Sequence, residues 1–208
     1  MGCQNMTSYV FSRTPNDGVS VKEVVILSSS FNLRYIFLLP FAASLWKKLG
    51  VQPIIILIGE KSIIRLFGAI LPLPGYSISD ETIFITSDAD LAVFNRSNHI
   101  PSLKNQKTIH LYNSNCCESV NVPPNRGNYA VKMYPMGTIG ATRQTWKNIM
   151  GFKKDVFNID EIEEYVQKEF GTQFFNPSDD TNTTLIGSSI WYSDQSLFSY
   201  KFDEWMEM

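Results

Sequence analysis

Three short apolar runs in the first half of the chain restrict its fold more than any other feature of the sequence. They occupy residues 21–30, 53–59 and 82–86, and their centres are rich in valine, isoleucine and phenylalanine. Continuous apolar runs of this length are typical of parallel strands that are buried on both faces. Apolar residues at helical spacing in 35–49 and 61–71 separate the runs. The alternation predicts an α/β sandwich with a mainly parallel, Rossmann-like central sheet that helices cover on both sides.

The second half of the chain contains shorter and more mixed patterns. Strands are predicted at residues 108–112 and 129–134, and helices at 141–150, at 159–170 and from residue 190 onward. The length of 208 residues and the hydrophobic content of 44% are those of one globular domain. We therefore expect a single domain over residues 21–208, preceded by a loose polar lead-in over residues 1–20.

Charge, hydropathy and cysteine spacing exclude several classes of protein. The formal net charge is −2 and the pI is about 5.7, whereas a general nucleic-acid binder carries a large basic excess. No apolar run approaches the roughly 18 residues of a membrane-spanning helix. We therefore expect no nucleic-acid partner and no membrane span in this chain. The cysteines form no zinc motif, and the adjacent pair Cys116 and Cys117 is not expected to bridge.

Polar residues follow two of the three predicted parallel strands. Ser28, Ser29 and Ser30 end the first apolar run, and residues 87–90 end the third. Ligands of open α/β sheets bind beyond the carboxyl ends of the strands. We therefore expect both segments to border a ligand site, where the three serines could contact a nucleotide.

Asp88 and Asp90 form the sharpest chemical motif in the sequence, directly after the third strand. Two carboxylates at a turn can converge on one hard cation, and Mg²⁺ or Mn²⁺ shares such ligands with substrate phosphates. The cation would neutralise the charge that develops on a departing diphosphate. Arg65, on the second predicted helix, could reach the same diphosphate. The structural alternative is that the two acids only cap a solvated turn.

Residues 87–90, placed after a strand, resemble the Asp-x-Asp motif of nucleotide-sugar glycosyltransferases of the GT-A fold. Residues 24–35 resemble the first strand and nucleotide-binding turn of that family. Residues 134–143 are similar to its glycine-containing segment, which faces the donor sugar and the acceptor. Residues 191–195 resemble its late acidic motif at a helix start. The resemblance therefore implies a GT-A-like sandwich and the transfer of a sugar to an acceptor hydroxyl.

The resemblance also implies roles for single residues and partners. Asp88 and Asp90 would bind Mn²⁺ or Mg²⁺, and Asp194 would be the catalytic base or an acceptor contact. Gly137 and Gly140 would line the donor site, which Asp88 shares. The donor would be a nucleotide diphosphate sugar, a UDP-sugar first among them, and the acceptor a glycan, protein or lipid. The family's usual location is the Golgi lumen.

Two departures from the family leave alternatives open. Only one helical segment separates the second strand from the Asp-x-Asp strand, and no histidine follows His110, although many members use a late histidine as a metal ligand. These departures favour an inactive glycosyltransferase-like binding module. A phosphatase of the haloacid-dehalogenase type would instead use Asp88 as nucleophile and Asp90 as acid and base. Its metal-binding acids would be Asp179 and Asp180, but no apolar strand precedes them.

Overall fold

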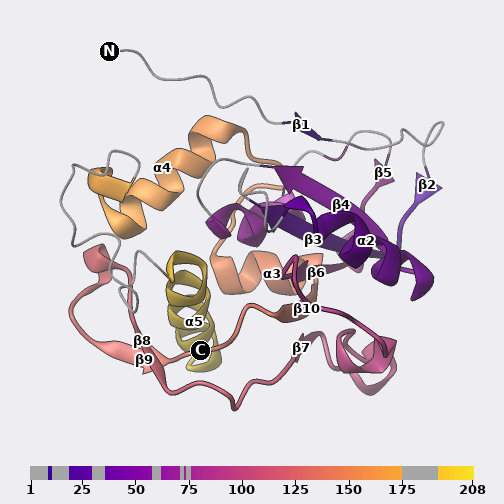
Figure 1. The fold of residues 1–208 in the computed structure, drawn as a ribbon. Coiled ribbons are helices and arrows are strands. Elements are labelled where there is room, and N and C mark those ends of the chain that lie inside the picture. The colour runs from indigo at the N-terminus through magenta and orange to yellow at the C-terminus, as the bar shows by residue number, and fades with distance from the viewer. Residues whose placement is uncertain are drawn as a thin grey trace.

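The computed structural model of the chain has a six-stranded sheet between helices (Figure 1). The residues that it describes are 9–10, 19–29, 36–57, 62–70, 73, 76–174 and 192–208. The strands follow one another across the sheet in the order β1 (Tyr9–Val10), β4 (Gln52–Leu57), β3 (Glu23–Ser29), β6 (Ile83–Ser87), β10 (Thr138–Thr142) and β7 (Ile109–Leu111). Because β3 pairs in parallel with both β4 and β6, the predicted parallel arrangement of the first three strands is confirmed.

The outer strands make the sheet mixed rather than mainly parallel. β1 runs antiparallel to β4, and β10 runs antiparallel to both β6 and β7. β10 is not among the strands predicted from the sequence, because Gly140 and Ala141 have weak strand propensity and residues from 141 onward read as a helix. Pairing with a strand on each side and full burial of residues 138–142 override that local preference. The prediction of a helix from residue 141 is therefore wrong by two residues.

Helices cover both faces of the sheet, as the apolar runs predict. They are α2 (Leu39–Lys48), the 3₁₀ helix η1 (Ser62–Ile70), α3 (Arg143–Met150), α4 (Ile159–Phe170) and α5 (Ser193–Met206). Val24 and Ile26 of β3 belong to the hydrophobic layer that includes residues of η1, α3, α4 and α5. Val25 and Leu27 point the other way, into the layer beneath α2. The alternation of neighbouring residues between two apolar layers explains why both faces of β3 are hydrophobic.

Local sequence signals set several helix ends. Pro40 lies in the first turn of α2, where its missing N–H removes no helical hydrogen bond. Thr142 caps α3 by accepting a hydrogen bond from the backbone N–H of Thr145. Asn158 and Glu161 form a reciprocal capping box at the start of α4, whose bounds agree with the predicted helix over 159–170.

Smaller elements surround this core. They are the parallel pair β2 (Val19–Ser20) and β5 (Tyr76–Ser77), the antiparallel pair β8 (Ser119–Asn121) and β9 (Ala130–Lys132), and the 3₁₀ helices η2 (Arg96–Asn98), η3 (Leu103–Asn105), η4 (Pro124–Arg126) and η5 (Thr172–Phe174). The predicted strand at 129–134 is thus β9, outside the central sheet, and it packs with Tyr200 of α5. Cys116 and Cys117, which precede β8, form a disulfide, contrary to expectation.

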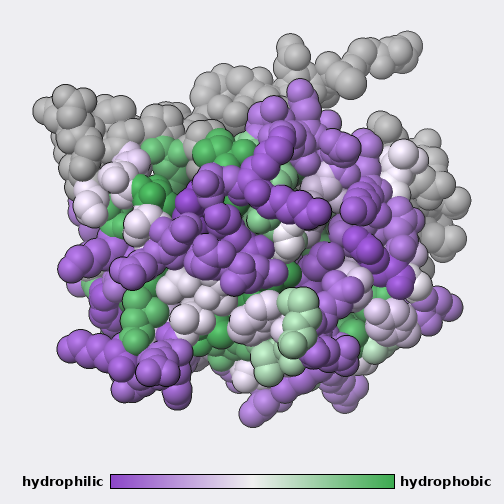
Figure 2. Space-filling model, turned by 180° about the vertical axis from the view of Figure 1, so that it is seen from behind, coloured by the Kyte–Doolittle hydropathy of each residue, from purple (hydrophilic) through white to green (hydrophobic). Residues whose placement is uncertain are grey.

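The face of the protein that lies behind the view of Figure 1 is mostly polar (Figure 2). Figure 2 shows the face opposite to that of Figure 1, where hydrophilic side chains predominate and hydrophobic ones gather in smaller areas. The most exposed large apolar side chains are Phe37, Phe94 and Met208, which come from three different segments. None of the helices in the described ranges has the length and apolar character needed to cross a membrane.

Candidate functional site

Arg65 joins two carboxylates at the carboxyl end of β6. Its Nε donates a hydrogen bond of 2.8 Å to Oδ2 of Asp194, and its Nη2 donates to the same oxygen. Its Nη1 donates to Oδ1 of Asp88. The side chains of Arg65 and Asp194 are 9% and 5% exposed, whereas that of Asp88 is 40% exposed. The structure thus brings together three predicted site residues, one from η1, one from the end of β6 and one from the start of α5.

Gly68 allows η1, which carries Arg65, to lie close against β3. A Cβ atom at residue 68 would lie 2.5 Å from Cγ1 of Ile26, a distance that real Cβ contacts do not reach. Arg65 lies three residues earlier, one turn of a 3₁₀ helix. The close approach at Gly68 therefore helps to set the position of the guanidinium group. In the sequence, Gly68 is a glycine inside an apolar helical pattern, and this signal could have identified it as a position of close packing.

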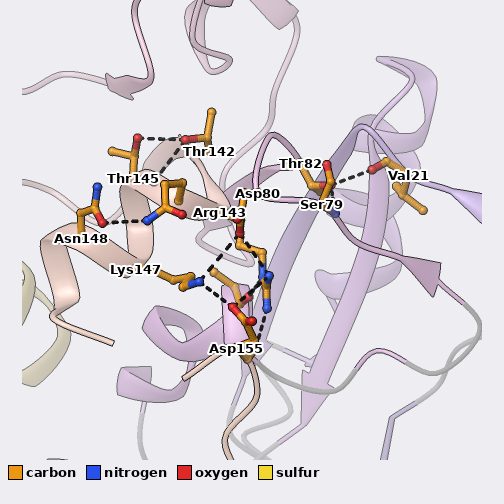
Figure 3. A network of polar contacts seen from close by, with 12 residues as sticks. Val21, Ser79, Asp80, Thr82, Thr142, Arg143, Thr145, Lys147, Asn148 and Asp155 are labelled. Atoms are coloured by element: carbon orange, nitrogen blue, oxygen red, sulfur yellow. Dashed lines mark hydrogen bonds and ion pairs between the residues drawn. The ribbon is translucent and has the colours of Figure 1, made fainter. Parts of the chain in front are cut away.

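A second polar network holds the far end of η1. Nε of Arg143 donates to the backbone oxygen of Ala69 at 3.0 Å, and its Nη1 lies 3.3 Å from Oδ1 of Asp80. Figure 3 shows Arg143 and Lys147 of α3 facing Asp80 and Asp155. These contacts fasten η1 to α3 and to the segment before β6. Arg143 was not a predicted site residue, and the structure gives it a supporting role.

The Asp-x-Asp segment turns away from the sheet while its central residue stays in the core. The backbone N–H of Asp88 donates to the carbonyl oxygen of Gly137 at 3.2 Å. Ala89 is buried in the layer beneath α2, and Asp90 is exposed. The buried alanine therefore anchors a turn that keeps one acid beside Arg65 and the other in solvent.

The charges of the site act on one another. Burial raises the pKa of Asp88; the positive charge of Arg65 opposes this shift, and the negative charges of Asp194 and Asp90 add to it. Burial alone would lower the pKa of Arg65, but the adjacent Asp194 and Asp88 reverse that effect and raise it. Two carboxylates thus contact one guanidinium, and the charge of the exposed Asp90 acts on Asp88, so the cluster has an excess of negative charge that can attract a cation.

Ser28 lies near the carboxyl end of β3, on the same face of the strand as Ile26 and therefore on the side of η1. Its Oγ is buried and has no hydrogen-bond partner within the described ranges. A buried hydroxyl is costly without a hydrogen bond, so the Oγ of Ser28 is a candidate donor to a ligand at this edge of the sheet. The side chain of Ser29 and the whole of Ser30, also predicted nucleotide contacts, lie outside the described residues.

The two predicted glycines have different positions. Gly137 precedes β10 and faces Asp88: a Cβ at residue 137 would lie 3.9 Å from Oδ2 of Asp88. Gly140 lies inside β10, where a Cβ would meet the carbonyl oxygen of His99 at 2.5 Å. Close packing against this backbone explains a glycine at residue 140 without any ligand. The structure therefore places Gly137 at the cluster and Gly140 in the interior of the sheet.

Asp88 and Asp90 are the candidate ligands for a divalent cation. Oδ1 of Asp88 accepts from Arg65, whereas Oδ2 has no recorded partner in the described part of the chain. Asp90 is exposed, and its charge acts on Asp88. Within the described ranges no group of three acidic, histidine or cysteine side chains could hold a metal. A cation at this site would therefore have at most these two carboxylates from the described residues, and Mg²⁺ or Mn²⁺ would need oxygens of water or phosphate to complete its coordination.

Comparisons with known protein families, with curated protein sequences and with solved structures found no match. The protein has a mixed α/β fold with a charged cluster at the carboxyl end of a parallel strand.

Proposed function

We propose that the chain is a metal-dependent glycosyltransferase, which moves a sugar from a nucleotide diphosphate sugar to an acceptor hydroxyl. The observation that carries the proposal is the convergence of Arg65, Asp88 and Asp194 at the carboxyl end of β6. Three distant segments supply these residues, and parallel α/β sheets bind ligands at this edge. The resemblance of residues 87–90 to the Asp-x-Asp motif of GT-A enzymes supports the same conclusion.

The charges of the cluster suit a diphosphate together with a divalent cation. Asp88, through an Oδ2 that has no partner among the described residues, and Asp90 would hold Mn²⁺ or Mg²⁺. The bound cation would supply positive charge for the departing diphosphate. Arg65 presents a planar guanidinium, which matches phosphate oxygens better than an ammonium does. The Oγ of Ser28, which has no partner within the described ranges, adds a donor on the strand next to β6.

The reaction breaks the bond between the anomeric carbon and the diphosphate oxygen. The electron pair of that bond leaves with the nucleotide diphosphate, and the acceptor oxygen forms the new bond to the anomeric carbon. The proton of the acceptor hydroxyl is transferred to a base or to the released diphosphate. Stabilising the charge on the leaving group is the part of this chemistry for which Arg65 and the two carboxylates are suited.

One observation favours a second candidate, a glycosyltransferase-like binding module without activity. Asp88 and Asp194 are already neutralised in part by Arg65, and a buried ion cluster of this kind can simply connect structural elements. In such a module a nucleotide diphosphate would still bind, but no sugar would be transferred. The phosphatase alternative requires Asp179 and Asp180, which lie outside the described residues.

A thermal-shift screen with a product assay separates these functions. The melting temperature would be measured with UDP, GDP and their sugar conjugates, each with Mn²⁺ or with EDTA. A glycosyltransferase is expected to be stabilised only when nucleotide and cation are both present, and to release nucleotide diphosphate from the matching sugar nucleotide. Stabilisation without product supports the binding module, whereas release of inorganic phosphate supports the phosphatase.

A further inference from the structure

The resemblance to GT-A enzymes implies that Asp194 is a catalytic base or an acceptor contact, but both of its oxygens already accept hydrogen bonds. Oδ2 accepts from Nε of Arg65 at 2.8 Å and from Nη2 of the same residue, and Oδ1 accepts from the backbone N–H of Gln195 at 2.8 Å. Its side chain is only 5% exposed. A general base needs an accessible lone pair within hydrogen-bond reach of the proton that it removes. The contacts of Asp194 are those of a group that holds another side chain in place.

We propose that Asp194 is a positioning residue, which holds Arg65 beside Asp88 so that Arg65 meets the phosphates of the donor. This inference rests on the proposed function for its ligand, but the Arg65–Asp194 contact exists without one. A guanidinium has five N–H donors. Nε, one Nη1–H and one Nη2–H are used by the two carboxylates. The remaining Nη1–H and Nη2–H have no recorded partner in the described part of the chain, so two donors are left for phosphate oxygens.

The geometry also explains why Asp194 lies at the start of α5. An acid in the first turn of a helix is stabilised by the helix dipole and by a backbone N–H, which here belongs to Gln195. The position of the carboxylate is therefore set by its own helix and does not depend on Arg65 alone. The carboxylate restricts the rotation of the long Arg65 side chain before any ligand binds. The entropy cost of ordering this side chain is therefore not subtracted from the free energy of ligand binding.

The first test measures the affinity of UDP in the presence of Mn²⁺ by calorimetry. Asp194→Asn and Arg65→Met are each expected to weaken binding about tenfold, the size of a lost charge-assisted contact. The double variant should be no weaker than Arg65→Met, because both changes remove the same interaction. Asp203→Asn is the matched control, since it removes the same charge from an exposed position of α5 and should leave the affinity unchanged.

Two results of this test would overturn the inference. A catalytic base acts on the acceptor and does not contribute to the binding of UDP. If Asp194→Asn binds UDP as tightly as the wild type, Asp194 is therefore a catalytic base or a purely structural residue, and it does not position Arg65 for the ligand. Additive losses in the double variant would show that Arg65 and Asp194 contact the ligand independently.

A ligand-free test applies even if the proposed function is wrong and the wild type binds no UDP. The Nε–H of Arg65, assigned by its loss in Arg65→Met, should exchange slowly with solvent in nitrogen-15 spectra of the wild type and of Asp203→Asn. It should exchange rapidly in Asp194→Ala. In Asp194→Asn it should exchange measurably faster than in the wild type, and this second variant serves if the alanine variant does not fold. Unchanged slow exchange in Asp194→Asn would show that Asp194 does not hold Arg65.

Discussion

Nε of Arg65 donates a 2.8 Å hydrogen bond to Oδ2 of Asp194, a residue 129 positions later in the chain. The same guanidinium contacts Asp88, so one side chain connects η1, α5 and the end of β6. Each of the three residues comes from an element that other contacts fix independently. The cluster is therefore a product of the tertiary fold, and its charges depend on all three elements being in place.

Replacing Arg65 should destabilise the protein strongly. Arg65→Met leaves the buried Asp194 without its counter-ion, and breaking such a pair typically costs about 3 kcal/mol or more. Urea unfolding measures this loss. Lys154→Met is the control, because Lys154 pairs with Glu161 and is itself 64% exposed, and an exposed pair contributes little to stability. Equal losses in both variants would contradict a special role for Arg65.

Adding a methyl group at residue 68 should disturb the site through η1. In Gly68→Ala the new Cβ overlaps Cγ1 of Ile26, and overpacking of this kind costs about 1–3 kcal/mol. The variant should also bind UDP and Mn²⁺ more weakly, because η1 carries Arg65. Gly137→Ala is the control for stability, since its nearest neighbour would be 3.9 Å away. A Gly68→Ala protein as stable as the wild type would show that η1 moves freely on β3.

Removing the hydroxyl of Ser28 should affect stability and binding in opposite directions. Because Oγ of Ser28 is buried and has no partner among the residues that the structure describes, Ser28→Ala should leave the unfolding free energy unchanged or raise it by about 1 kcal/mol. The affinity for UDP should fall if the hydroxyl contacts the nucleotide. Ser199→Ala is the matched control, because its buried Oγ accepts from the backbone N–H of Tyr134 at 3.0 Å, and its loss should destabilise the protein. A destabilised Ser28→Ala would reveal a partner in the folded chain.

The sequence predicts the parallel centre of the sheet because β3, β4 and β6 are apolar on both faces, a local property that can be read directly. It does not predict β10, whose strand conformation depends on pairing with β6 and β7 rather than on the propensity of Gly140. The acids after β6 are recognisable from their spacing, and Asp194 from its resemblance to a late acidic motif. Their common contact with Arg65 is a long-range interaction, and no pattern of neighbouring residues encodes it.

The stability of the protein should depend on the ionisation of Asp88. Its pKa is raised in the folded state, mainly by burial, so the ionised carboxylate disfavours folding at neutral pH. This carboxyl stabilises the fold fully below the ordinary pKa of aspartate and loses that contribution as the pH rises through its raised folded value. Asp88→Asn should therefore gain stability relative to the wild type as the pH rises from about 4 to 7. If the difference in unfolding free energy between Asp88→Asn and the wild type is constant across this pH range, the pKa of Asp88 is not raised in the folded state.

The most direct test of the metal-dependent nucleotide site is the double variant Asp88→Asn/Asp90→Asn, measured by thermal shift with UDP and Mn²⁺. Asparagine caps a turn as well as aspartate does, so the ligand-free melting temperature should change little or rise. The wild type should gain about 2.7 kcal/mol of stability at a hundredfold excess of UDP over its dissociation constant, and only with Mn²⁺ present. The account predicts that the double variant loses this cation-dependent gain. A double variant that is stabilised by UDP and Mn²⁺ as fully as the wild type would contradict it.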